Sequence, residues 1–271
     1  MSQQKFQSQD GKVQLVGAGP GDPELITVKG SRALETADVI VYDRLANPDL
    51  LSITSEESEH IYVGKRPGKP SVSQDQINHI LITKAREGKK VVRLKGGDSF
   101  VFGRGGEECM ALKAADIPYE VVPGISSALA APAFAGIPVT HRKVARSFTV
   151  VTGHTIKKSD SFEEWEHLAK ADTLVILMGM RNLPNITERL ISFGRDADTP
   201  AAVIEKATYE SQQTVVATLA TIADEAAHLS SPATIVVGEL ASKGKELNWF
   251  QKESIEQETT TNEKFVTNFA G

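Results

Sequence analysis

Two glycine-rich segments are the parts of this sequence best suited to ligand chemistry. The first, Val16–Pro23 (VGAGPGDP), follows a β-branched run and precedes a helical pattern. Glycine permits tight turns and lets a ligand approach the backbone closely. The dinucleotide fingerprint, however, requires Gly or Ala where this segment has Asp22, and Pro20 lacks the amide hydrogen that a pyrophosphate would use. The segment therefore predicts either a ligand loop of another type or a simple strand-to-helix turn.

The second segment, Lys95–Gly106 (KGGDSFVFGRGG), has five glycines in twelve residues, more than a single turn needs. It follows the apolar run Val91–Lys95, which has the character of a buried strand. Open α/β sheets bind ligands in the crevice beyond the carboxyl ends of their strands. We therefore expect the two segments to face one crevice, although this pairing does not identify the ligand.

The composition excludes several other classes of protein. The chain has 40% hydrophobic and 24% charged residues, which is typical of a folded protein and unlike a disordered one. It lacks a long apolar stretch and its first residues are polar, so neither a membrane span nor a secretory signal is expected. The formal net charge of −5 argues against binding to a nucleic-acid backbone. These features predict a protein with no nucleic-acid or membrane partner, and the presence of a single cysteine points to the cytoplasm.

Metal and thiol chemistry are not indicated. Cys109 is the single cysteine, which rules out an internal disulfide and makes a thiolate-rich metal site implausible. The six histidines do not have the spacing of a zinc site, so no metal is predicted. Cys109 lies in a predicted helix, Arg104–Ala115, and we expect a buried, inert thiol.

Short β-branched runs alternate with helical patterns along the whole chain, which predicts an α/β fold. In the first half the recurrence of Ile77, Ile80, Leu81 and Ala85 indicates a helix with one apolar face. The predicted strands of this half are Val13–Gly17, Val39–Tyr42, His60–Val63, Val91–Lys95 and Tyr119–Val122.

In the second half, two consecutive strands before the last helix predict a mixed sheet, where the first half predicts a mainly parallel one. The predicted strands are Phe148–Thr152, Thr173–Met178, Ala201–Glu205, Thr214–Ala217 and Thr234–Gly238. The predicted helices are Phe162–Ala169, Leu183–Phe193 and Ile222–His228.

The boundary between two domains is predicted at the polar, basic stretch 140–146. The stretch Gly124–Ala135 before it is rich in small residues, which let a helix approach a neighbouring backbone closely. We predict an N-terminal domain over residues 12–142, a C-terminal domain over 147–250, and a mobile tail over 251–271.

The order and wording of the motifs resemble the uroporphyrinogen-III C-methyltransferases of the tetrapyrrole methylase family. The similarity extends over about Val13–Leu240, nearly the whole folded chain. The matching motifs are Val16–Pro23, Val41–Leu45, Gly64–Arg66, Gly96–Asp98, Phe100–Gly106, Val122–Ser126, Gly136–Arg142 and Met178–Gly179.

This resemblance implies two α/β domains with S-adenosyl-L-methionine held in the cleft between them, usually in a homodimer. Asp43 matches the proposed general base and Lys65 the proposed proton donor. The positions that match the cofactor site are Pro20, Gly96, Gly97, Asp98, Val101, Ser126, Ser127, Met178 and Ala207.

The resemblance also implies a substrate, uroporphyrinogen III, methylated on rings A and B in turn to give precorrin-1 and then precorrin-2. Siroheme and cobalamin synthesis share this product, and the sequence does not choose between them. Because the substrate carries eight carboxylates, its site needs cations despite the negative total charge, and arginine is suited to bidentate carboxylate contacts. We expect Arg44, Arg66 and Arg104 to bind it.

Three positions depart from the family pattern. Ser99 stands where proline is common, Pro70 where histidine is common after the Gly-Lys-Arg motif, and Ala207 where glycine is frequent. The change at Ser99 should affect only the stiffness of the turn. Pro70 removes a titrating side chain, so any role of that histidine is lost here.

Other interpretations of the sequence remain open. The same fold and cofactor could serve another precorrin, a protein residue or a ribosomal RNA nucleotide. A nicotinamide-dependent enzyme and a noncatalytic ligand-binding protein are two further alternatives. Asp43, taken without the resemblance, could simply cap a helix or pair with Arg44.

Overall fold

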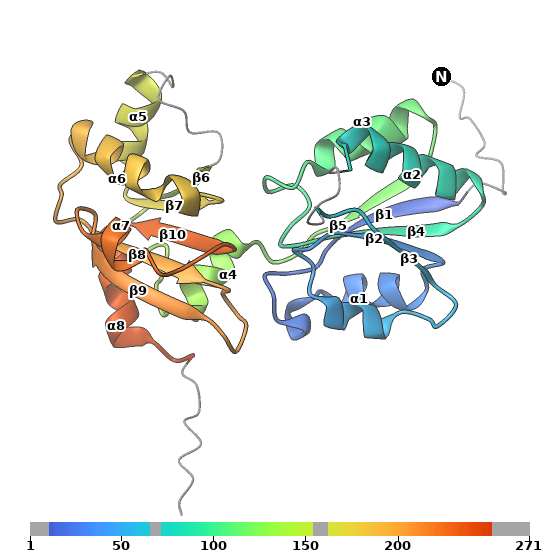
Figure 1. Ribbon diagram of the computed structural model, residues 1–271, viewed down its shortest axis with the longest axis horizontal. Coiled ribbons are helices and arrows are strands. Elements are labelled where there is room, and N and C mark those ends of the chain that lie inside the picture. The colour runs from blue at the N-terminus through green and yellow to red at the C-terminus, as the bar shows by residue number, and fades with distance from the viewer. Residues whose placement is uncertain (1–10, 66–71, 154–161, 251–271) are drawn as a thin grey trace, which may run out of the picture.

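The computed structural model describes residues 11–65, 72–153 and 162–250, and forms two five-stranded sheets that lie side by side in Figure 1. This confirms the predicted α/β class, with one parallel and one mixed sheet. The predicted tail over 251–271, Arg66 and Pro70 lie outside the described residues.

The first sheet has the strand order β3-β2-β4-β1-β5, and every neighbouring pair is parallel. Its strands are β1 (Lys12–Gly17), β2 (Val39–Tyr42), β3 (Glu59–Tyr62), β4 (Lys90–Lys95) and β5 (Tyr119–Val122). Because all five run the same way, the segments that follow them meet at one edge of the sheet.

Helices cover both faces of this sheet, as a parallel sheet requires. Helix α1 (Val28–Glu35) covers one face, and α2 (Gln74–Arg86) and α3 (Gly105–Ala114) cover the other. Ile77, Leu81 and Ala85 of α2 are buried against β1 and β4, which confirms the predicted apolar face. Ser73 and Gln76 form a reciprocal capping box that starts this helix.

The second sheet has the order β6-β7-β10-β8-β9, with only β6 and β7 parallel. Its strands are β6 (Phe148–Thr152), β7 (Thr173–Leu177), β8 (Pro200–Glu205), β9 (Gln213–Thr218) and β10 (Ala233–Val237). Its helices are α5 (Phe162–Ala169), α6 (Leu183–Ser192), α7 (Ile222–Glu225) and α8 (Gly244–Leu247). Helix α7 is shorter than predicted because the amides of Ala227 and Leu229 bond three residues back, in turns and not in an α-helix.

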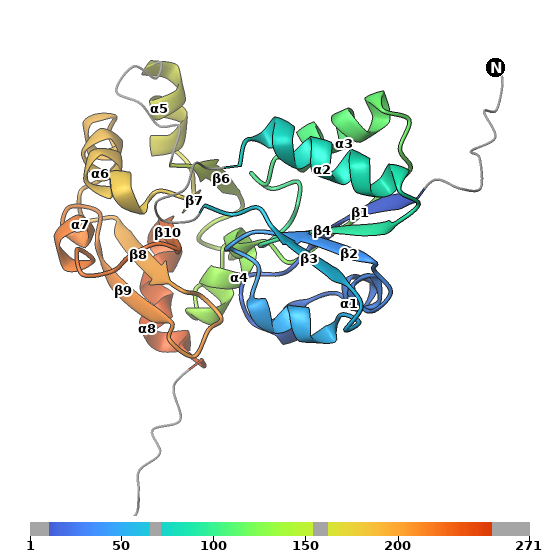
Figure 2. The ribbon, with the colours of Figure 1, turned by 45° about the vertical axis from the view of Figure 1, so that its right-hand side comes forward.

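Helix α4 (Ser127–Phe134) belongs spatially to the second sheet, although it precedes the predicted boundary at 140–146. Ala131 and Ala135 pack with Ala202, Ile204 and Val236 of β8 and β10. Figure 2 shows α4 beside the second sheet and next to the first. The chain therefore passes from the first sheet to the second directly after β5. The small side chains on one face of α4 let this helix pack closely on the second sheet.

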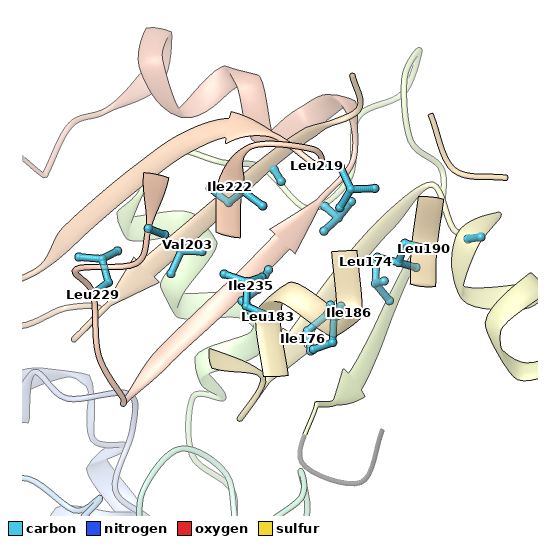
Figure 3. Close-up of a cluster of buried hydrophobic side chains, with 14 of the residues drawn as sticks. Leu174, Ile176, Leu183, Ile186, Leu190, Val203, Leu219, Ile222, Leu229 and Ile235 are labelled. Atoms are coloured by element: carbon cyan, nitrogen blue, oxygen red, sulfur yellow. The ribbon is translucent and has the colours of Figure 1, made fainter. Parts of the chain in front are cut away.

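The opposite face of the second sheet carries the largest apolar cluster, shown in Figure 3. Ile235 of β10 is fully buried there among Ile176, Leu183 and Ile186. We expect Ile235→Ala to lower the free energy of unfolding by about 2–5 kcal/mol, and Ile235→Val by about 0.5–1.5 kcal/mol, because a cavity replaces the lost methyl groups. Urea titration followed by circular dichroism measures both, and equal losses for the two variants would contradict this account.

Candidate functional site at the carboxyl edge of the first sheet

The two glycine-rich segments lie against each other at the carboxyl ends of β1 and β4. Gly19 donates its amide to Gly97 O at 3.2 Å, and Gly97 donates its amide to Gly19 O at 2.6 Å. Both glycines have positive φ, +79° and +67°, which a side chain rarely adopts. The two segments therefore meet at one edge of the sheet, as a shared crevice would require.

A third segment, between β5 and α4, closes against the same two turns. Asp98 accepts hydrogen bonds from Gly124 N at 3.0 Å and Phe100 N at 2.8 Å. A Cβ placed on Gly17 would lie 2.5 Å from Gly124 N and 2.7 Å from Gly97 O. This close backbone contact explains why glycine is required in all three segments.

Ser126 and Ser127 stand at the start of α4, beside these turns. Ser126 Oγ accepts a hydrogen bond from Ala128 N at 3.2 Å and caps the helix. A Cβ on Gly97 would lie 3.8 Å from Ser127 N, so the N-terminus of α4 lies next to the glycine turn. The partial positive charge at a helix N-terminus favours an anionic group, such as a carboxylate.

The second domain contacts the first turn through the loop between β8 and β9. Asp22 donates its amide to Thr208 Oγ1 at 2.9 Å, and Tyr209 packs against Gly21. Ala207, a predicted cofactor residue, precedes Thr208 and is partly buried. Residues from both domains thus meet at Pro20–Asp22.

Two other predicted cofactor residues expose apolar side chains. Val101 follows the second turn and is 37% exposed, and Met178 follows β7 and is 49% exposed. Met178 has a φ of +55°, an unusual backbone for a residue with a side chain. Apolar side chains beside glycine turns suit a flat adenosyl group, so the residues present fit the expected cofactor.

Asp43 lies at the end of β2 and takes part in a buried network of charges. Its Oδ2 accepts from Arg93 Nη2 at 2.9 Å, and its Oδ1 accepts from Leu45 N at 3.0 Å. Arg93 also donates from Nε to Glu108 Oε1 at 3.1 Å. The Asp43 side chain is 25% exposed, whereas Arg93 and Glu108 are 3% and 0% exposed.

Lys95 completes this network, with Nζ at 2.9 and 3.0 Å from the two oxygens of Glu108. Burial lowers the pKa of Lys95, and the charge of Arg93 acts in the same direction. Arg93 and Glu108 were not predicted as site residues from the sequence, and Lys95 was predicted only as the end of a strand and the start of a glycine-rich loop. The one available signal was charged residues within the apolar run 91–95. Asp43 thus pairs with Arg93 and not with Arg44.

The predicted substrate cations lie around the same edge, with different exposure. Arg44 and Lys65 are exposed at the ends of β2 and β3, and Arg66 lies outside the described residues. Arg104 precedes α3 and forms a bidentate pair with Glu107, at 2.8 and 2.7 Å. This hydrogen-bonded pair lowers the pKa of Glu107. Arg104 must therefore share its guanidinium with Glu107 in order to bind a substrate.

Ser99, the departure next to Asp98, is fully buried, and its hydroxyl has no hydrogen-bond partner within the described part of the chain. An unsatisfied buried hydroxyl costs about 1–3 kcal/mol. We therefore expect Ser99→Ala to raise the free energy of unfolding by about 1 kcal/mol. Chemical denaturation measures this change. The matched control, Ser126→Ala, removes a helix cap and should lower the free energy of unfolding by about 1 kcal/mol. A loss of stability in both variants would refute the interpretation of Ser99.

Among residues 11–65, 72–153 and 162–250, no three His, Cys, Asp or Glu side chains are grouped so that they could hold a metal ion. In the same ranges no helix has the length and apolar character needed to cross a membrane. Cys109 is buried in α3, as expected, and burial raises the pKa of its thiol.

Comparison with known proteins shows similarity over the residues that form this site. Residues 12–223 match the model of the tetrapyrrole (corrin/porphyrin) methylases. The chain is 55% identical over 237 residues to a uroporphyrinogen-III C-methyltransferase of Methanocaldococcus jannaschii, covering 86% of this chain and 97% of that protein. It is 47% identical over 251 residues to the Bacillus subtilis protein of the same name, covering 92% and 98% of the two chains.

The fold is also that of a solved relative. A uroporphyrin-III C-methyltransferase from Thermus thermophilus, complexed with S-adenosyl homocysteine, is 39% identical and has a TM-score of 0.74. The match covers 86% of this chain and 99% of that one. Both glycine turns, Asp43 and the loop with Ala207 fall inside the matched family region, so the chain belongs to the tetrapyrrole methylase family.

Proposed function

We propose that this chain is an S-adenosyl-L-methionine-dependent uroporphyrinogen-III C-methyltransferase, which makes precorrin-2 by way of precorrin-1. The observation that carries the proposal is the pairing of Gly19 with Gly97 beside Asp43 at one edge of the parallel sheet. The uroporphyrinogen-III C-methyltransferases to which the chain is 47–55% identical support the choice of substrate.

The cofactor supplies a methyl group that the sulfonium charge already activates, so the main task of the protein is alignment. The residues that would hold it are Pro20, Gly96, Gly97, Asp98, Val101, Ser126, Ser127, Met178 and Ala207. Positioning two reactants in line recovers association entropy worth up to about 7–11 kcal/mol in favourable model systems. The hydrogen bonds between Gly19 and Gly97, and between Asp98 and Gly124, give this site a fixed backbone.

Asp43 is the proposed base, which removes a proton from the macrocycle after each methyl transfer. Its two oxygens each accept one hydrogen bond from the protein, which leaves further lone pairs for an incoming proton. Lys65, exposed after β3, is the proposed proton donor. General acid–base assistance typically contributes about 10²–10⁴-fold to a rate.

Arg44, Arg66 and Arg104 are the proposed partners of the substrate carboxylates. Arg44 follows Asp43 directly, and Arg104 borders the second glycine turn, so both sit beside the proposed base or the cofactor turns. Their guanidinium groups match the geometry of a carboxylate, which makes them the main source of substrate orientation.

The test is an oxygen-free incubation of the protein with S-adenosylmethionine and uroporphyrinogen III, followed by product mass. We expect a gain of one methyl group and then two. No gain would reject the substrate, and calorimetric titrations with S-adenosylhomocysteine and with NADH would then separate the remaining classes. Binding of NADH alone would reject the methyltransferase altogether.

We also propose a cytoplasmic homodimer. Leu129, Leu247 and Trp249 are 48%, 52% and 62% exposed and surround a hollow of about 320 Å³, an apolar face suited to a second copy. Light scattering of the purified chain should give twice the mass of 29.2 kDa, and a monomer would remove this part of the proposal. The product serves siroheme or cobalamin synthesis, and the genomic neighbours of the gene would distinguish them.

A further inference from the structure

A continuous line of alternating charges runs from the buried interior of the first domain to Asp43. Lys95 contacts Glu108, Glu108 contacts Arg93, and Arg93 contacts Asp43, all at 2.9–3.1 Å. Lys95 and Arg93 lie two residues apart on β4 and therefore point to the same face, where α3 presents Glu108. The four formal charges sum to zero, and Asp43 is the most exposed of the four side chains.

Arg93 is held at almost every polar atom of its guanidinium. Its Nη1 donates to Leu94 O at 2.9 Å and to Val41 O at 3.3 Å, and its Nε donates to Glu108. These bonds leave Nη2 directed at Asp43. Because the guanidinium is planar, fixing two of its nitrogens also fixes the direction of the third.

Glu108 is the residue on which this arrangement depends. It is fully buried and accepts from Arg93, from Lys95 and from Gln74 Nε2 at 3.2 Å. Stability alone does not account for such a network, because apolar residues of similar volume often replace a buried ion pair at no cost. A charge network that ends on the proposed base is better explained by a role in orienting that base than by a role in stability.

We propose that Glu108 is a positioning residue for methyl transfer, which acts through Arg93 to fix the Asp43 carboxylate, while Lys95 balances its charge. This inference rests on the proposed function. It assigns no contact with substrate or cofactor to Glu108, Arg93 or Lys95.

The test compares a charge-balanced variant with a matched control. Glu108→Gln combined with Lys95→Met removes one charge of each sign and keeps an acceptor for Arg93. Glu166→Gln combined with Lys170→Met makes the same two changes in an exposed pair at the end of α5, in the second domain. We expect the first variant to lose at least about 10-fold in kcat, with KM for uroporphyrinogen III and affinity for S-adenosylhomocysteine within about 3-fold, and the control to keep all three.

Coupling to Asp43 separates a positioning role from a purely structural one. If Glu108 acts through Asp43, then adding Asp43→Ala to the Glu108/Lys95 variant should cost much less than Asp43→Ala costs in the unmodified chain. The inference is overturned if Asp43→Ala costs the same in both backgrounds, or if the folded Glu108/Lys95 variant keeps full kcat. In that case, methylation by the unmodified chain still upholds the proposed function. An inactive unmodified chain instead rejects both.

Arg93→Lys gives the same comparison if the charge-balanced variant fails to fold. Lysine keeps the positive charge but cannot bond Glu108 and Asp43 together in the fixed geometry of a guanidinium. We expect kcat to fall at least about 10-fold with KM retained, again with a reduced further cost of Asp43→Ala. Full activity of Arg93→Lys would overturn the inference.

Discussion

Asp43→Ala is expected to slow methylation of uroporphyrinogen III by about 10²–10⁴-fold while leaving the affinity for S-adenosylhomocysteine unchanged. The carboxylate is the proposed acceptor of the proton that leaves the macrocycle, and no other carboxylate of the buried network reaches the surface, since Glu108 is fully buried. Among the described residues, the Asp43 side chain is hydrogen-bonded to Leu45 and Arg93 and not to the glycine turns. The rate is measured from product mass over time, and the affinity by calorimetry.

Asp43→Asn is the informative companion variant. Asparagine keeps one oxygen, which can accept from Arg93 or from Leu45, places an NH2 donor where the other oxygen stood, and does not take up a proton. We therefore expect a loss close to that of alanine. If the asparagine variant turned over at the normal rate, Asp43 would be an anchor for Arg93 and the base would have to be sought elsewhere.

Gly124→Ala should weaken binding of S-adenosylhomocysteine by about 10- to 100-fold, corresponding to the roughly 1–3 kcal/mol that overpacking costs. A Cβ on Gly124 would overlap Gly97 O and lie 2.7 Å from the Cα and carbonyl carbon of Gly17. All of these are backbone atoms, which do not move aside as a flexible side chain can. The third segment must therefore move away from the two glycine turns, and the Asp98 bond to Gly124 N is strained.

Gly106→Ala is the matched control for this prediction. Gly106 lies in α3, and a Cβ there meets nothing within 4 Å. We expect unchanged cofactor affinity and a gain in stability of about 0.5–1 kcal/mol, because alanine loses less entropy in a helix. Calorimetry and thermal melting report the two quantities. Equal affinity of the Gly124 and Gly106 variants would show that contact between the turns does not matter for binding.

The fold was predictable from local patterns in the sequence. Most strands are short runs rich in β-branched residues, and each strand of the described residues overlaps a predicted one, with ends that differ by one residue at most. The pairing of the two glycine segments followed from the rule that parallel strands end at one edge. Periodicity and turn chemistry are properties of residues close together in the sequence, so they can be recognised without the three-dimensional structure.

The charge network at Asp43 was not predictable in the same way. Asp43 directly follows β2, whereas Arg93 and Glu108 lie on β4 and α3, and the three are separated by 50 and 15 residues along the chain. Their sequence neighbours give no sign of mutual contact, and from the sequence alone Asp43 could cap a helix or pair with Arg44. Only the side-by-side placement of β2 and β4, with α3 above them, brings the three side chains together.

The position of α4 determines how this protein can be divided. Ala131, Ala135 and Ile137 rest on β8 and β10, although they precede the basic stretch 140–146. A fragment cut after Arg142 would carry this apolar surface with nothing to cover it, and we expect such a fragment to aggregate. A cut between Val122 and Ser126 would separate the sheets more cleanly, but it would sever the polypeptide between Asp98 and the helix that begins at Ser127. The proposed methyl-donor site draws residues from both halves, and we expect neither half alone to retain it.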